Sequence, residues 1–146
     1  MKNEIMTIDR NYIISRLSNW KDRLQNLFSD IKNWSEMIEG NIAIKEFDIP
    51  QAREELMSKF DVKPETIHKL VLSNNTFRAS FVPMGLWVMG SNGRVNITTQ
   101  KDQYILVDLG EDSTPKWTIV NPAKRKEQVD FTQETLKKII DGEEIF

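Results

Sequence analysis

The stretch of sequence that decides the fold runs from residue 13 to residue 38 and reads IISRLSNWKDRLQNLFSDIKNWSEMI. Large apolar residues recur in it at alternating spacings of four and three, which is the spacing of one face of an α-helix. This stripe consists of Ile13, Leu17, Trp20, Leu24, Leu27, Ile31, Trp34 and Ile38. The spacing predicts one continuous helix about 38 Å long, with Gly40 at its C-terminal cap.

The apolar stripe can be buried in two ways, against a second copy of the chain in a coiled coil or against a sheet of the same chain. Trp20 and Trp34 occupy two of the positions that a two-stranded coiled coil reserves for leucine, and both are too bulky for a regular seam. We therefore expect packing within one molecule, with self-association as the alternative.

The composition of the chain fits one globular domain and excludes several kinds of chemistry. The 146 residues are 39% hydrophobic and 29% charged, with a net charge of −2, so no global attraction to nucleic acid or to an anionic membrane is expected. The absence of cysteine excludes disulfides, thiolate metal sites and thiol nucleophiles, and the single histidine excludes a three-histidine metal site. The charged N-terminus lacks the apolar run of a secretory signal, and no window approaches the roughly 18 apolar residues of a membrane span. We expect a cytoplasmic protein without membrane contact or cofactor.

A second helix is predicted after Asp48, which is a good N-cap residue, with Pro50 in the first turn. Its apolar face would consist of Ala52, Leu56, Met57 and Phe60. Residues 41–47 would then connect two helices of a hairpin. This interpretation divides the single domain, residues 1–146, into a helical part over residues 1–62 and a sheet with a C-terminal helix over residues 63–146.

Period-two alternation begins at residue 66 and predicts antiparallel strands. A turn at Asn74-Asn75 would pair residues 66–73 with residues 76–82, although Pro64-Glu65 could instead open a short helix. The predicted register places one set of side chains on a common face: His68, Leu70, Leu72, Phe77, Ala79 and Phe81.

The strongest hairpin signal is Asn92-Gly93, which would join residues 86–91 to residues 94–100 through a type I′ turn. In that hairpin Leu86, Val88, Val95 and Ile97 share one face. The opposite face carries the side chains that we select as the candidate partner-binding surface: Trp87, Met89, Asn96 and Thr98. A further strand over residues 103–109 would add Ile105 and Val107 to that face.

The C-terminal third is predicted as an acidic loop over residues 110–115, a strand over residues 116–120 and a final helix with Thr132 as its N-cap. The helix would direct inward Leu136, Ile139 and Ile140. The predicted fold is therefore α+β: a long N-terminal helix and a second helix, a five- to six-strand antiparallel meander, and a C-terminal helix.

Groups able to carry catalysis are scarce. His68 would face Leu70, Ala79 and Phe81, none of which can orient an imidazole, so a core role is favoured over acid–base catalysis. Three loop carboxylates within five residues could hold Mg²⁺ or Ca²⁺ and support a metal-dependent hydrolase: Asp108, Glu111 and Asp112. Without a histidine or cysteine nearby, a hydrated loop is the favoured interpretation, and no metal is expected.

The sequence thus favours a non-enzymatic protein-interaction or accessory module that binds a protein partner or forms a homo-oligomer. The alternative is a nucleic-acid-associated accessory protein, in which phosphates would contact Arg94, Lys124, Arg125 and Lys126. Glu127 and Asp130 weaken the positive field of that basic run.

Overall fold

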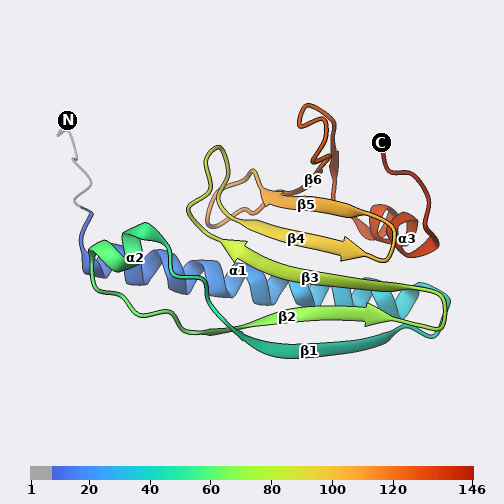
Figure 1. Cartoon of the computed structure of the whole chain (residues 1–146), viewed down its shortest axis with the longest axis horizontal. Coiled ribbons are helices and arrows are strands. Elements are labelled where there is room, and N and C mark those ends of the chain that lie inside the picture. The colour runs from blue at the N-terminus through green and yellow to red at the C-terminus, as the bar shows by residue number, and fades with distance from the viewer. Residues whose placement is uncertain (1–7) are drawn as a thin grey trace.

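The computed structural model describes residues 8–146, and Figure 1 shows a long helix lying across one face of an antiparallel sheet. The elements in chain order are α1 (Arg10–Met37), β1 (Ala43–Pro50), α2 (Glu55–Lys59), β2 (Thr66–Ser73), β3 (Arg78–Gly85), β4 (Arg94–Thr99), β5 (Gln103–Asp108), β6 (Trp117–Val120), β7 (Gln128–Asp130) and α3 (Gln133–Asp141). The seven strands neighbour one another in chain order, so the sheet is a meander. The α+β prediction is confirmed, and the strand count is seven rather than five or six.

Helix α1 is continuous, as its periodicity predicts. Asp9 caps it by accepting a hydrogen bond from the Tyr12 amide at 2.8 Å. Most of its apolar stripe is buried within the single chain, and Ile13, Trp20 and Ile31 are at most 1% exposed. The stripe therefore packs on the chain's own sheet. The helix ends at an extended Ile38 rather than at Gly40, which lies in the turn toward β1.

Strand β1 occupies the segment that the sequence predicts as a connection between two helices. Asp48 does not cap a helix, because it lies in β1 directly opposite His68 of β2. Helix α2 is only five residues long and has Glu54 as its N-cap. The sequence does not predict this strand, because an edge strand with mostly exposed side chains lacks the alternating apolar face that marks a strand. It also lies inside residues 1–62, the part expected to be helical.

Strand β2 has the predicted bounds, but its register with β3 is shifted by two residues. Leu72 lies opposite Ala79 rather than Phe77, because the Asn74 amide donates to the Phe77 carbonyl and moves the turn to residues 75–76. The Asn74 side chain also accepts from the Thr76 amide at 2.9 Å, a local bond that favours this turn. A shift of two keeps each side chain on its predicted face. The alternative helix at Pro64-Glu65 is wrong.

The predicted hairpin at Asn92-Gly93 is wrong. Strand β3 itself pairs with β4, and residues 86–93 form a loop between them. Tertiary contacts override the local turn preference: Gly93, at a φ of +132°, packs so tightly on Trp20 that a Cβ would lie 2.2 Å from the indole ring. The loop is also fixed by Glu54, whose carboxylate accepts from the amides of Leu86 and Trp87.

The C-terminal third largely follows the predictions. Ile105 and Val107 lie opposite Asn96 and Arg94, on the sheet face away from α1. Thr132 caps α3, and Gly142 ends it with a left-handed φ of +71°. Strand β7 is the unpredicted element, because three residues paired only with β6 are too short for a periodic signal.

The hydrophobic core lies between α1, α3 and the inner face of the sheet, where the largest fully buried side chains include Trp20, Phe81, Leu106 and Ile119. Within residues 8–146, none of the helices has the length and apolar character needed to cross a membrane.

Replacing Leu24 with Ala tests this packing. Leu24 is 4% exposed, so the cavity left by the substitution should lower the free energy of unfolding by about 2–5 kcal/mol in a urea melt. The matched control is Asn33→Ala on the exposed side of α1, which should leave the free energy of unfolding unchanged or raise it by less than about 1 kcal/mol, because alanine is the better helix former. Equal free energies of unfolding for the two variants would contradict burial of the stripe.

Candidate functional site

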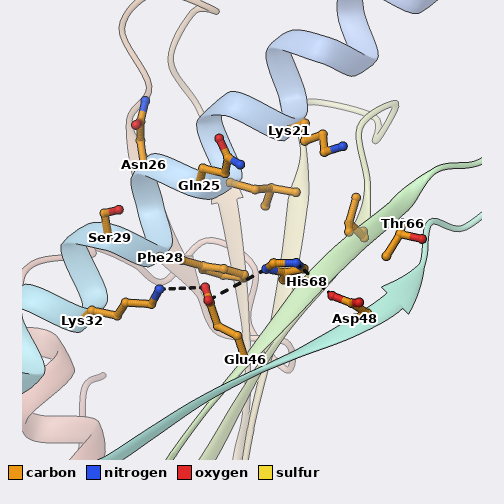
Figure 2. Close-up of a pocket in the computed structure, with 12 residues that line it drawn as sticks. Lys21, Gln25, Asn26, Phe28, Ser29, Lys32, Glu46, Asp48, Thr66 and His68 are labelled. Carbon is orange, nitrogen blue, oxygen red and sulfur yellow. Dashed lines mark ion pairs between the residues drawn. The ribbon is translucent and has the colours of Figure 1, made fainter.

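A cleft of about 710 Å³ separates the middle of α1 from strands β1 and β2 (Figure 2). Its α1 side is formed by Lys21, Leu24, Gln25, Asn26, Phe28, Ser29 and Lys32. Its strand side is formed by Glu46, Asp48, Thr66, Ile67 and His68. Both sides combine apolar side chains with charged ones, so the cleft can contact a ligand through both kinds of interaction.

Helix and strand periodicity explain why these residues meet. Leu24 and Phe28 are four residues apart and therefore lie on one side of α1. Glu46 and Asp48 are two residues apart in β1 and therefore point to the same face of the sheet. The β1–β2 register then places His68 directly opposite Asp48.

His68 lies between two carboxylates, as Figure 2 shows. Its Nε2 is 3.0 Å from Oδ1 of Asp48, and its Nδ1 is 3.9 Å from Oε2 of Glu46. Glu46 is also paired with Lys32, whose Nζ lies 2.9 Å from Oε1. The prediction of a core histidine with only apolar neighbours is therefore wrong, because both carboxylates come from β1. His68 is half exposed.

This arrangement can bind charged and hydrogen-bonding groups of a ligand. When His68 is protonated, both ring nitrogens can donate toward the flanking carboxylates, so the ring joins them as a cation. Ser29 and Thr66 supply hydroxyl groups to the same cleft.

A second polar cluster, under the 86–93 loop, fixes α1 to the sheet. Arg23 and Asp108 are 2% and 0% exposed, and Nη1 of Arg23 lies 2.7 Å from Oδ2 of Asp108. Arg23 also donates to the Asn92 carbonyl and to the Asn19 side chain, both at 2.7 Å. Asp108 accepts further bonds from the amides of Gly110 and Lys116. The network uses these groups structurally, although Nη2 of Arg23 is buried without a hydrogen-bond partner in the described chain.

Two of the three carboxylates considered for a metal are paired with different arginines, and the third, Glu111, is exposed. Asp108 pairs with buried Arg23, and Asp112 pairs at the surface with Arg16. Hydrogen bonding from the Arg16 guanidinium is the main reason that the pKa of Asp112 is lowered. Residues 8–146 contain no group of three or more acidic, histidine or cysteine side chains placed to hold a metal ion.

The four residues selected for partner binding lie in two different places. Met89 is fully exposed in the 86–93 loop, and Trp87 in the same loop packs partly against the core. Asn96 and Thr98 project from the outer face of β4. Their neighbours in the strand, Val95 and Ile97, are buried toward α1, and side chains alternate between the two faces of a strand.

The residues of the nucleic-acid alternative come from two separate segments, strand β4 and the turn between β6 and β7. Arg94 lies on the outer face of β4, where it donates to Asn96 and lines a shallow pocket together with Pro122. Lys124, Arg125 and Lys126 follow Pro122 in the turn between β6 and β7.

Comparisons with protein-family models, with curated proteins and with solved structures found no match. The cleft and its charged residues are therefore the basis for a functional proposal.

Replacing Asp108 with Asn tests the buried pair. The substitution leaves the Arg23 charge buried without its counter-ion, and the free energy of unfolding should fall by about 3–5 kcal/mol in a denaturant titration. Glu111→Gln changes an exposed carboxylate of the following loop and serves as the control. A loss below about 1 kcal/mol for Asp108→Asn would show that the pair does not hold α1 in place.

Replacing Arg16 with Gln should raise the pKa of Asp112 toward its ordinary value, as measured by NMR titration of the carboxyl group. A lowered folded-state pKa stabilises the fold above the ordinary aspartate pKa, and this contribution is lost as the pH falls through the lowered pKa. The stability difference between the wild type and Arg16→Gln should therefore shrink on acidification. Because the Asp112 side chain is 45% exposed, the difference should not exceed about 1 kcal/mol. An unchanged Asp112 titration would contradict the pairing.

Proposed function

We propose that this chain is a non-enzymatic interaction module that binds a segment of a partner protein in the cleft between α1 and strands β1 and β2. The observation that carries the proposal is the combination of an apolar floor and charged rims in a cleft of about 710 Å³. Small-molecule sites and peptide grooves share this composition, in which apolar contacts supply affinity and a few polar groups fix orientation.

The exposure of the strand side favours a protein segment over a small molecule. The cleft adjoins β1, an exposed strand at the edge of the sheet, so an occupant can extend from the cleft along the strand. Phe28 and Ile67 provide apolar contact, while Lys21 and Asp48 provide charges of opposite sign on facing walls. A peptide carries apolar, charged and backbone groups together and can satisfy all of these.

The charge balance of the cleft argues against a nucleic-acid backbone there. Lys21 and Lys32 on α1 are matched by Glu46 and Asp48 on β1, so phosphates entering the cleft would meet carboxylates as well as ammonium groups. The nucleic-acid alternative therefore rests on residues outside the cleft, at Arg94 and the turn over residues 124–126.

Site-specific photo-crosslinking in the cells that naturally make this protein tests the proposal. A photoreactive benzoylphenylalanine replaces Gln25, which lines the cleft, and in the matched control replaces Asn33, which does not. We expect a discrete crosslinked protein from position 25 and none from position 33. Adding Ser29→Trp should abolish the crosslink, because an indole would fill the cleft.

Crosslinks of equal yield from both positions, or a yield that Ser29→Trp leaves unchanged, would contradict binding in the cleft. Crosslinking to RNA or DNA in place of protein would favour the nucleic-acid alternative.

A further inference from the structure

Strand β1 is the longer edge of the sheet, and half of its backbone groups face away from the neighbouring strand. The amide of Gln51 donates to the Glu65 carbonyl at 2.9 Å, in continuous register with the β1–β2 ladder. Because ladder bonds alternate along an antiparallel strand, the odd-numbered residues of β1 bond β2, and Ile44, Glu46 and Asp48 direct their N–H and C=O groups outward. Pro50 falls at an outward position too, where an edge strand tolerates the missing N–H.

A second copy of the chain is a poor occupant of this edge. Two copies of β1 can pair edge to edge in antiparallel orientation around a two-fold axis normal to the sheet. Opposed residues then lie on the same face of the sheet, so one residue of β1 lies opposite its own copy and marks the centre of the register. The registers that pair five or more residues of β1 centre on Lys45, Glu46, Phe47 or Asp48. They oppose Lys45 with Lys45, Glu46 with Glu46, Glu46 with Asp48, and Asp48 with Asp48. Like charges directly opposite one another destabilise a strand pair, so β1 is protected against self-pairing.

The same charges specify a different occupant. Glu46 and Asp48 combine outward backbone groups with side chains on the cleft face, and the Asp48 side chain is 75% exposed. Phe47, between them, is 43% exposed on the other face. In an antiparallel added strand, two residues spaced two apart would lie opposite Glu46 and Asp48, and the residue between them would lie opposite Phe47.

We propose that β1 binds its partner by strand addition, taking up an extended segment in which two basic residues flank an apolar one. This inference rests on the proposed function and names the partner chemistry. Main-chain bonds to Ile44, Glu46 and Asp48 supply affinity, and the basic side chains reach the carboxylates at the mouth of the cleft. The opposite edge, β7, is only three residues long and offers a much shorter ladder.

NMR titration of the isotope-labelled full chain with two synthetic peptides tests the proposal. Both peptides have the length of β1; one alternates Lys with Val and the other alternates Glu with Val. The Lys–Val peptide should shift the amide resonances of β1 in a saturable manner, whereas the Glu–Val peptide should not. Asp48→Asn should weaken Lys–Val binding about two- to fivefold, the effect of one cross-strand charge pair.

Ile44→Pro removes an outward N–H without changing any charge and should abolish binding, while the matched control Ile44→Thr keeps the N–H and should bind. Equal binding of the two peptides, or Lys–Val shifts confined to residues 124–126, would overturn strand addition. Absence of β1 shifts together with a persisting crosslink from position 25 would also overturn it, while leaving the cleft proposal intact. If the Lys–Val peptide binds β1 but no crosslink forms at position 25, strand addition stands and binding in the cleft fails.

Discussion

Burial of one face of α1 is the constraint on which the rest of the structure depends. A helix of 28 residues is about 42 Å long, so its apolar stripe needs a cover that extends across the whole molecule. The meander provides that cover, because several strands each contribute an inward residue such as Leu70, Phe81 or Ile97. Apolar burial alone does not fix the position of the helix along its axis. The buried Arg23–Asp108 pair does, because sliding α1 would leave two charges without partners.

The elements that the sequence predicts well are those whose pattern is contained within the element. Helices α1 and α3 have apolar faces of helical period with side-chain caps at Asp9 and Thr132, and β2 ends at a turn that its own asparagine stabilises. The failures depend on distant residues. Asn92-Gly93 is a strong hairpin signal in isolation, but Trp20 and Arg23, about 70 positions earlier, hold it in a loop.

The candidate site could not be predicted, because its chemistry comes from segments that the sequence does not connect. His68 is the obvious residue to consider, yet its carboxylate neighbours become visible only once β1 is known to pair with β2. Phe28, outside the regular stripe of α1, likewise lines the cleft only through the fold, because β1 and β2 form the other side. What the sequence does offer is the pair Glu46 and Asp48, whose spacing places them on one face of any strand.

The position of α1 ahead of every strand of the sheet has a consequence for synthesis on the ribosome. The stripe ends at residue 38, whereas the sheet residues that cover it continue to Ile119, so about 80 further residues must be made before the cover is complete. At a synthesis rate of about 5–20 residues per second, the apolar face stays uncovered for roughly 4 to 16 s. A nascent amphipathic helix exposed for that time is an apolar segment of the kind that chaperones bind.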